Sequence, residues 1–493
     1  MKSFQQVLLF LLVLGLAALT VTAKINLAKL RQKFISATKA NSTLFVRSLD
    51  YLHREPPFGE ATNRYVKDDM WIEQKLDHFN ESNTETWQMR YLMNDQYYQE
   101  GGPIFIFVGG EWAISAGGIT RGHLVDLAAE HKGILYYTEH RYYGKSKPTN
   151  DLTIPNLKYL NAKEALADLA HFIKYQRHNT PGLANSKVIM AGGSYSASLV
   201  VWFKRLYPEL LAGGFASSAP ILAKIDFKEY KEVCGRAILE FGGQKCYDRV
   251  EKGVAELEAM IEQGRTAEIK AMMQLCDTFD ENNDLDLWSL FSTISNLFAA
   301  IIQYQQGDDV PIICDYLLEA DNDVVAIAKF FLLFVDNACI DVSYKGTLAY
   351  YIDSTYTGGA NRPWFYQTCN EFGWYQTSSS RNQPFGTKFP LTLNNVLCED
   401  VFGPEHTNSK LTAKVAQINL DFGGLTPNVT NVYQTHGSLD PWSALGHTAA
   451  DGATILSSES HCSDFNSISK DDSAEVRASK EKLAELVREW LAN

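Results

Sequence analysis

The sequence predicts an α/β fold, with a largely parallel sheet that carries helices on both faces. Strand-like apolar runs alternate with helical stretches over residues 66–220, and the alternation returns over residues 401–493. Such alternation is typical of parallel sheets, because the helices that connect parallel strands pack onto the sheet. Residues 221–400 lack the alternation and contain long helical stretches instead. We therefore expect a helical domain inserted between two parts of one sheet domain.

The N-terminal end has the features of a secretory signal peptide. Lys2 provides a short basic region, residues 7–19 are apolar, and residues 21–23 are small enough for a cleavage site. The apolar run is short for a helix that spans a membrane. We predict that residues 1–23 are the signal peptide and are removed. Residues 24–65 are polar, and we expect a propeptide or a loose N-terminal arm there.

Five runs in the first part of the sheet domain are expected to be strands. The first alternates like a half-buried strand, and the second is continuously apolar, as a buried strand is. These runs are residues 87–92, 103–108, 133–137, 187–191 and 213–217. Helices are expected between them at 119–130 and 161–178, the second of which has an apolar stripe.

The inserted segment predicts helices at 256–275 and 287–305, and it holds seven of the eight cysteines. An even number of cysteines in a secreted chain favours disulfides. The candidates are Cys234, Cys246, Cys276, Cys314, Cys339, Cys369, Cys398 and Cys462. Their spacing does not choose among the many possible pairings. Since no two of them form a Cys-x-x-Cys pair, we expect no zinc site and no other metal.

The last part of the chain predicts two more strands, at 431–435 and 453–456, and a closing helix. The apolar side of that amphipathic helix carries Val476, Leu483, Leu486, Val487 and Trp490. Three sequons, at Asn41, Asn80 and Asn428, become candidate glycosylation sites in a secreted chain.

The composition is that of a globular protein. The chain of 493 residues is 45% hydrophobic and 21% charged, with a formal charge of −13. Its length allows two or more domains or one large decorated domain. The acidic excess argues against nucleic acid as a partner, because phosphate binding needs a basic face.

Ser194 has the sequence setting of a nucleophile elbow. It follows a strand-like run and precedes residues 197–203, which predict a buried helix. A serine on such a turn has its hydroxyl exposed, as in serine hydrolases. Gly192 and Ser196 flank the turn, where strand and helix approach too closely for large side chains. The usual pattern is Gly-x-Ser-x-Gly, so Ser196 replaces the expected last glycine.

A serine nucleophile needs a histidine base and an acid that orients this histidine. On a sheet of this kind the chain order is serine, acid, histidine, each after a strand. Asp440 and His461 follow the two strands predicted in the last part of the chain. Alone, each residue is common in turns and on surfaces, but together they have the expected order. We therefore predict the triad Ser194, Asp440 and His461, with His447 as a lower-ranked alternative base because it precedes the last strand.

An oxyanion hole needs two main-chain N–H groups that point at the developing negative charge. One is expected from Tyr195, directly after the nucleophile. The other is expected from the glycine-rich loop after the strand at 103–108, from Gly110 or Glu111. The Glu111 carboxylate is a hypothetical partner for a substrate's amino terminus. Arg141, which lies near the same rim of the sheet, is expected to be an ion-paired brace.

Several segments resemble the prolyl carboxypeptidase and dipeptidyl peptidase II family of serine peptidases. They are residues 74–79, 139–144, 192–195, 216–220 and 437–442. The residue pair Tyr195-Ser196 after the nucleophile is most similar to the thymus-specific serine protease branch of that family. The resemblance runs from about residue 70 to the C-terminus.

The resemblance implies an α/β-hydrolase domain, made of residues 66–220 and 401–493, with an inserted helical cap at 221–400. On the matching positions it implies that Ser194 is the nucleophile, Asp440 the orienting acid and His461 the base. It also implies serine peptidase activity, often on peptides with proline near the cleaved bond. Ala197 and Cys462 depart from the pattern, and a disulfide at Cys462 would fix the loop of His461.

We expect a secreted or lysosomal serine peptidase without a cofactor, which removes residues from an end of short peptides through an acyl-enzyme. The expected partner is a peptide substrate, with no nucleic acid and no membrane contact after signal cleavage; a homodimer is left open. The sequence does not choose between carboxyl-end and amino-end cleavage. An esterase or lipase on the same fold, or a catalytically silent secreted binding protein, are the alternatives.

Overall fold

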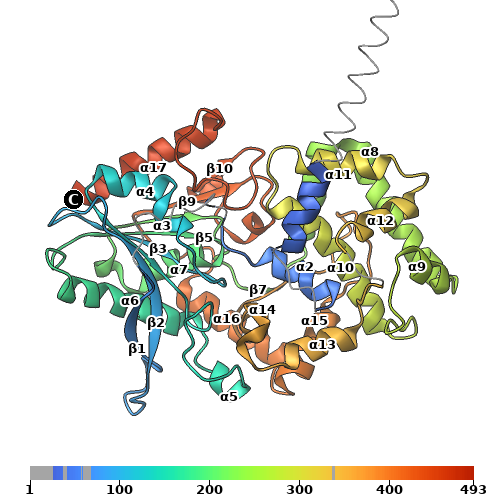
Figure 1. Cartoon of the computed structure of the whole chain (residues 1–493), viewed down its shortest axis with the longest axis horizontal. Helices are drawn as coiled ribbons and strands as arrows, with labels where there is room; N and C mark the ends of the chain where they lie inside the picture. The colour runs from blue at the N-terminus through green and yellow to red at the C-terminus, as the bar shows by residue number, and fades with distance from the viewer. Residues whose placement is uncertain (1–25, 37–41, 57, 59–67, 336–338, 493) are drawn as a thin grey trace, which may run out of the picture. The chain divides into compact units, whose positions relative to one another are not determined.

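The computed structural model describes residues 26–36, 42–56, 58, 68–335 and 339–492 (Figure 1). The chain divides into two compact units. The sheet unit consists of His53–Val233, Leu348–Ser380 and Pro390–Asn493. The helical unit consists of Met1–Leu52, Cys234–Thr347 and Arg381–Phe389. The predicted signal peptide and most of residues 53–67 lie outside the described residues.

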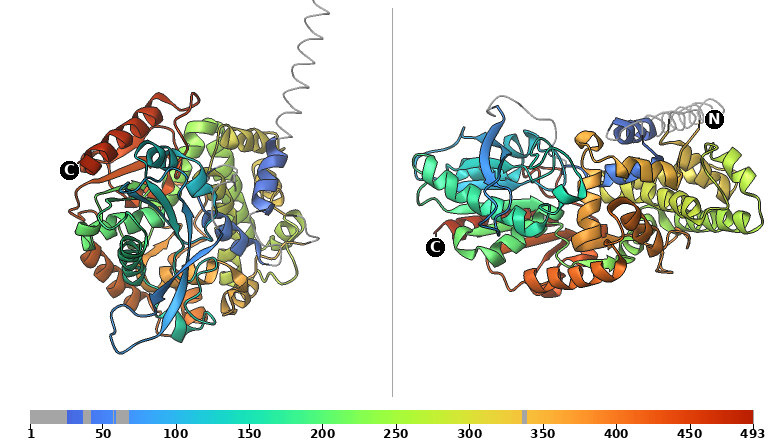
Figure 2. Two further views of the ribbon diagram at one scale, coloured as in Figure 1. Left: turned by 60° about the vertical axis from the view of Figure 1, so that its left-hand side comes forward. Right: turned by 90° about the horizontal axis from the view of Figure 1, so that it is seen from below.

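The sheet unit is built on an eight-stranded sheet with the strand order β1-β2-β4-β3-β5-β6-β9-β10. The strands are β1 (Met70–Lys75), β2 (Thr86–Asn94), β3 (Ile104–Val108), β4 (Ile134–Thr138), β5 (Val188–Gly193), β6 (Gly213–Ser217), β9 (Val432–Gly437) and β10 (Thr454–Leu456). The last six strands of this order, which are β4, β3, β5, β6, β9 and β10, are parallel to one another. At the other edge of the sheet, β1 and β2 pair antiparallel (Figure 2). All seven predicted strands are present, and the predicted α/β-hydrolase fold is confirmed.

Helices cover both faces of this sheet, as predicted. On one face, α4 (His123–Glu130) and α17 (Ala474–Ala492) contact each other; on the other face lie α6 (Ala162–Asn179) and α7 (Tyr195–Leu206) (Figure 1). Alternate strand residues such as Phe105, Phe107 and Tyr137 point to the first face and form one apolar cluster with residues of α4 and α17. This alternation is the two-residue period of a strand.

Two local details of the sheet unit differ from the sequence prediction. Residues 119–130 form two helices, α3 (Gly117–Thr120) and α4, because Gly122 adopts φ 98° between them. The edge strand β1 was not predicted at all. By contrast, α6 begins where expected, since the Asn161 side chain caps it by accepting a hydrogen bond from the Glu164 amide at 2.9 Å.

The helical unit contains α2, α9, α10, α11 and α12 together with most of α8. Their bounds are α2 (Leu44–Leu52), α8 (Glu229–Glu262), α9 (Thr266–Met272), α10 (Asp284–Gln303), α11 (Asp309–Leu318) and α12 (Asp323–Leu332). The central helix α10 contacts α2, α11 and α12. It is long and apolar enough to cross a membrane, but 83% of its most apolar stretch is buried, as in the core helix of a folded unit.

The segment 221–400, predicted as one inserted cap, is shared between the two units. Residues 234–347 and 381–389 belong to the helical unit, and residues 221–233, 348–380 and 390–400 belong to the sheet unit. The sheet unit therefore also contains α14 (Asn361–Gln367), the single-turn π-helix η3 (Thr368–Phe372), β8 (Gly373–Tyr375), which pairs with β7 (Lys224–Asp226), and α15 (Leu391–Phe402). Its remaining helices are α5 (Ile154–Leu157), η1 (Pro208–Leu210), η2 (Tyr356–Gly358), α16 (Asn408–Phe422), η4 (Pro441–Leu445) and η5 (Ala449–Asp451), while α13 (Tyr344–Ile352) crosses the boundary between the units.

Six of the eight candidate cysteines form three disulfides. The pairs are Cys246–Cys314 and Cys276–Cys339 in the helical unit and Cys369–Cys398 in the sheet unit. Cys234 and Cys462 are buried and stand outside these disulfides. The expectation of a disulfide at Cys462 is therefore wrong, because its thiol is enclosed by the sheet unit and has no cysteine beside it among the described residues.

Candidate active site

Ser194 lies at the turn between β5 and α7, as the sequence predicts. Its backbone has φ 57° and ψ −132°, which a residue with a side chain rarely adopts. Such a conformation costs about 1–3 kcal/mol and persists only where the surroundings impose it. The main-chain N–H of Ser194 donates to the Ser217 carbonyl of β6 at 3.0 Å, which ties the turn to the neighbouring strand. This is the geometry of a nucleophile elbow.

The small residues of the elbow have specific reasons. A Cβ atom at Gly192 would lie 2.4 Å from the Ser196 carbonyl oxygen, so only glycine fits there. Ser196, which stands where glycine was expected, is fully buried. Its hydroxyl donates to the Gly193 carbonyl at 2.9 Å and accepts from the Gly193 amide at 3.0 Å. The Ser196 side chain therefore closes the elbow instead of obstructing it.

Asp440 and His461 form a buried hydrogen-bonded pair. Asp440 follows β9 at the start of η4, and its Oδ1 lies 2.8 Å from Nδ1 of His461. Because a carboxylate only accepts, Nδ1 must carry the proton. The same Oδ1 accepts from the Trp442 amide at 2.9 Å, which fixes the carboxylate. Acid and histidine thus have the mutual arrangement that a serine triad needs.

The electrostatics of this pair favour the ionised carboxylate beside a protonatable imidazole. Burial by itself lowers the pKa of His461, but the Asp440 carboxylate outweighs it and raises this pKa well above its usual value. Burial by itself raises the pKa of Asp440, but His461 outweighs it and holds this pKa below its usual value. Asp440 therefore makes His461 a stronger base than an isolated imidazole.

Two consecutive residues at the end of β6, Ser217 and Ser218, bind the nucleophile and the residue that follows His461. Ser194 donates to the Ser217 carbonyl at 3.0 Å, and the main-chain N–H of Cys462 donates to the Ser218 hydroxyl at 2.9 Å. A Cβ atom at Gly193 would lie 3.1 Å from the sulfur of Cys462. The residues beside Ser194 and beside His461 are therefore in contact across this strand end.

Asp464 supports the same loop and was not predicted. We call residues 460–465 the His461 loop. The buried Asp464 carboxylate accepts from the hydroxyls of Ser217 and Thr435, both at 2.6 Å. Burial raises its pKa, although both hydroxyls work against this. Its place three residues after His461 is the only sequence signal, and that position alone does not distinguish it from a turn residue.

The two expected sources of oxyanion N–H groups stand at the ends of β3 and β5. Tyr195 is the first residue of α7, so no carbonyl of that helix accepts its main-chain N–H. The Gly109 amide already donates to the Thr138 carbonyl at 2.9 Å. The amides of Gly110 and Glu111, the next two residues of this loop, are thus the ones that remain as candidates.

The Glu111 side chain is turned into the protein. Its Oε1 lies 3.6 Å from Nδ1 of His53, and the side chain is buried. Within the described residues, its Oε2 is buried and has no hydrogen-bond partner. The His53 ring also packs on Trp364, with ring centroids 5.0 Å apart. Contact of Glu111 with a substrate's amino terminus stays a hypothesis.

The alternative base, His447, is used elsewhere. Its Nδ1 accepts from the Gln434 side chain at 2.9 Å, and its Nε2 donates to the Leu425 carbonyl at 3.0 Å. Both ring nitrogens therefore have structural partners, neither of which is Asp440.

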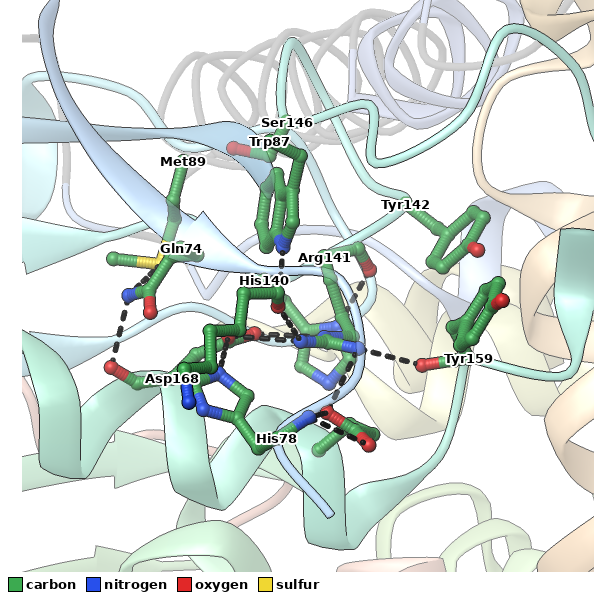
Figure 3. Close-up of polar contacts among 12 residues, drawn as sticks. Gln74, His78, Trp87, Met89, His140, Arg141, Tyr142, Ser146, Tyr159 and Asp168 are labelled. Atoms are coloured by element: carbon green, nitrogen blue, oxygen red, sulfur yellow. Dashed lines mark hydrogen bonds and ion pairs between the residues drawn. The ribbon is translucent and has the colours of Figure 1, made fainter. Parts of the chain in front are cut away.

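Arg141 is the ion-paired brace that the sequence suggested (Figure 3). The fully buried guanidinium donates to both carboxylate oxygens of Asp168, at 2.7 and 2.8 Å, and to the Tyr159 carbonyl at 2.8 Å. Burial opposes its charge, but Asp168 keeps the pKa of Arg141 above its usual value. Asp168 also binds His78 at 2.8 Å, so the cluster joins α6 to the segment that follows β1.

Two of the sequons lie in the described residues. Asn80 and Asn428 are both exposed, and their glycosylation stays a prediction. Asn41 lies outside the described residues. In the part of the chain that the structure describes, no group of three or more His, Cys, Asp or Glu side chains is placed to hold a metal ion.

Comparison with known proteins shows what the chain is similar to. Residues 74–483 match the family model described as serine carboxypeptidase S28. The thymus-specific serine protease of Mus musculus is 30% identical over 450 residues, covering 85% of this chain and 87% of that protein. The lysosomal Pro-X carboxypeptidase of Pongo abelii is 27% identical over 417 residues, covering 77% and 78%. Among solved structures, the epoxide hydrolase VrEH1 from Vigna radiata covers 88% of this chain and 99% of its own at 10% identity, with a TM-score of 0.33.

Proposed function

Because the chain belongs to the S28 family of serine carboxypeptidases, and is therefore a serine-type peptidase, we propose that it is an exopeptidase using Ser194, Asp440 and His461. The observation that carries this proposal is the 2.8 Å bond between Asp440 and His461. The residue after His461 is bound at the end of β6, to which the Ser194 elbow is also bound. No cofactor takes part in the proposed reaction.

In the proposed mechanism, the Ser194 hydroxyl attacks the carbonyl carbon of the scissile peptide bond. Nε2 of His461, the ring nitrogen not bound to Asp440, takes the serine proton. It then gives this proton to the leaving amine. The Tyr195 amide and one amide from Gly110 or Glu111 stabilise the tetrahedral oxyanion. Water, activated by His461, then hydrolyses the acyl-enzyme and regenerates Ser194.

For the substrate, we propose short peptides with proline near the cleaved bond. The support is the family membership and the relative that is named a lysosomal Pro-X carboxypeptidase. For the location, we propose secretion or the lysosome, which the apolar leader of residues 7–19 and the three disulfides support.

A fluorophosphonate probe tests the chemistry directly, because it phosphonylates only an activated serine. The mature wild-type protein should be labelled, whereas Ser194→Ala and His461→Ala should not. Equal labelling of the wild type and Ser194→Ala would overturn the nucleophile assignment. Absence of labelling in the wild type would overturn the peptidase proposal.

A quenched peptide library then tests the substrate class. Peptides with a blocked amino end, a blocked carboxyl end or both should separate the two directions of chain-end cleavage. Peptides blocked at both ends should resist cleavage. Fast cleavage of doubly blocked peptides would contradict the exopeptidase proposal, and hydrolysis of acyl esters alone would favour an esterase.

A further inference from the structure

The side chain of Tyr195 is held by a chain of buried hydrogen bonds behind the elbow. Its hydroxyl lies 3.1 Å from Nε2 of His140 and accepts from the Gln367 side-chain amide at 3.0 Å. Gln367 in turn accepts from the Tyr143 hydroxyl at 2.6 Å and lies 3.4 Å from a carboxylate oxygen of Glu371. All five side chains belong to the sheet unit and are buried.

The direction of each of these bonds follows from its chemistry. Nδ1 of His140 lies 2.8 Å from the Arg141 carbonyl, which can only accept, so Nδ1 carries a proton. Burial lowers the pKa of His140 to about 4, so its ring is neutral and Nε2 is an acceptor. The Tyr195 hydroxyl therefore donates to His140 and accepts from Gln367.

The orientation of the Gln367 amide is fixed in the same way. Its NH₂ group has two acceptors, the Tyr195 hydroxyl and Glu371, and its oxygen has one donor, the Tyr143 hydroxyl. The Glu371 carboxylate is itself held by the Ala162 amide at the start of α6, at 3.0 Å. The hydrogen-bond chain therefore runs from the Arg141 carbonyl to α6 without a mismatched pair.

Aromatic packing leaves the Tyr195 ring in one position. The rings of Trp364 and Phe372 lie on it with centroid distances of 5.5 Å each, and His140 also lies at 5.5 Å. The Tyr195 side chain is 1% exposed. Trp364, Gln367 and Phe372 all come from α14 and η3, a segment far from the elbow in sequence.

We propose that Gln367 is a positioning residue for the oxyanion hole, which acts by fixing Tyr195 and thereby its main-chain N–H. The peptide plane between Ser194 and Tyr195 is set by ψ of Ser194 and φ of Tyr195. Ser194 is strained, so a rotation of this plane would relieve strain and turn the N–H away. The clamped Tyr195 side chain opposes this rotation. This inference rests on the proposed serine peptidase function and deepens it.

Three variants test the positioning role: Gln367→Met, which keeps the shape but removes the polar atoms, Tyr195→Phe, and the double variant. Each single change should lower kcat about tenfold, below the 10²–10³-fold loss of a whole oxyanion donor, with KM within about twofold. The double variant should lose no more than either single variant, because both remove the same bond. Tyr366→Phe on the same helix is the matched control and should leave kcat unchanged.

An ester and its thionoester provide a readout that a purely structural role would not move. Sulfur is a poor hydrogen-bond acceptor, so acylation by the thionoester depends less on the oxyanion N–H groups. Gln367→Met should therefore lower ester acylation much more than thionoester acylation, at an unchanged fraction of folded protein.

Equal losses for both substrates would overturn the inference, and so would additive losses in the double variant. If Gln367→Met fails to fold, Tyr195→Phe alone carries the same ester comparison, because it removes one hydroxyl and keeps the ring packing. Labelling of Ser194 by the fluorophosphonate in the wild type, with unchanged ester kinetics in both single variants, would reject the positioning role and leave the peptidase function standing.

Discussion

The main-chain amide of Cys462 donates a 2.9 Å hydrogen bond to the hydroxyl of Ser218, and this bond joins the His461 loop to the strand end beside the nucleophile. Ser218 has φ 60° and is 1% exposed, so its hydroxyl is held in place by the sheet. The placement of His461 thus depends on a serine that has no chemical role of its own in the proposed reaction.

Replacing this serine should weaken catalysis through the position of His461. Ser218→Ala leaves the buried Cys462 amide without its acceptor, which costs about 1–3 kcal/mol of folding free energy. We expect kcat to fall several-fold, and denaturant unfolding to show the loss of stability. Ser198→Ala is the matched control, because the buried Ser198 hydroxyl donates to the Pro220 carbonyl at 2.9 Å. Equal kcat values in the two variants would contradict the prediction.

Asp440→Asn tests the orienting acid. The asparagine NH₂ would face Nδ1 of His461 and force the proton to Nε2, so the ring could not accept the proton of Ser194. Loss of the corresponding acid in a serine triad lowers kcat about 10⁴-fold. A kcat within tenfold of the wild type would exclude Asp440 as the orienting acid.

The pH profile of the same pair has a definite sign. Asp440 raises the pKa of His461, and the proposed base is active only when neutral. The acid limb of wild-type kcat/KM should therefore lie above the value of about 6.5 of a free histidine. Removing the charge in Asp440→Asn should move the limb of the residual activity to lower pH. If the acid limb does not move in Asp440→Asn, the group that titrates in this limb is not His461.

The sequence predicted the strands that are buried on both faces, because a continuous apolar run has few other interpretations. It predicted Asp440 and His461 because their chain order and their place after strands follow from the fold. It did not predict β1, an edge strand that ends in three consecutive polar residues, Glu73, Gln74 and Lys75, and so lacks a clear alternation. It predicted one helix at 119–130 where the structure has α3 and α4, because the φ of 98° at Gly122 depends on the close approach of the Phe465 carbonyl.

The supporting residues of the site were beyond sequence reasoning for a related reason. Gln367 lies 172 positions from Tyr195, and Asp464 lies 247 from Ser217. Both are polar residues in segments without a period or motif that links them to the elbow. Their roles follow from long-range contacts, which a single sequence does not encode in local patterns.

Ser196→Gly restores the more usual elbow pattern and should be less stable. It removes two hydrogen bonds between the Ser196 hydroxyl and Gly193, each worth about 1 kcal/mol. It also increases the backbone entropy of the unfolded chain, which lowers the stability of the fold. Ser196→Ala removes the same bonds without that increase in entropy, so the difference between the variants isolates the backbone term. Thermal and denaturant unfolding measure both. A Ser196→Gly variant as stable as the wild type would show that the hydrogen bonds between the Ser196 hydroxyl and Gly193 contribute nothing to the stability of the fold.

Glu371→Gln should stabilise the protein at alkaline pH, although it alters a hydrogen-bonded residue. Burial raises the pKa of Glu371 to about 7 from 4.5, against the Ala162 amide, Gln367, Lys414 and Lys163, which all lower it. The folded state therefore binds more protons than the unfolded state between these values, so stability falls as pH rises through this window.

The shift of 7 − 4.5 = 2.5 units corresponds to about 3 kcal/mol at about 1.4 kcal/mol per unit. At pH 5 the wild type carries a neutral acid, and Glu371→Gln should unfold with a similar free energy. At pH 8 the variant should be the more stable protein, by up to that amount, in urea titrations at both pH values. Glu481→Gln, on the exposed side of α17, controls for the loss of one negative charge. If the variant is less stable than the wild type at pH 8, the prediction is wrong. The contacts of the ionised Glu371 carboxylate would then stabilise the fold by more than the burial of its charge destabilises it.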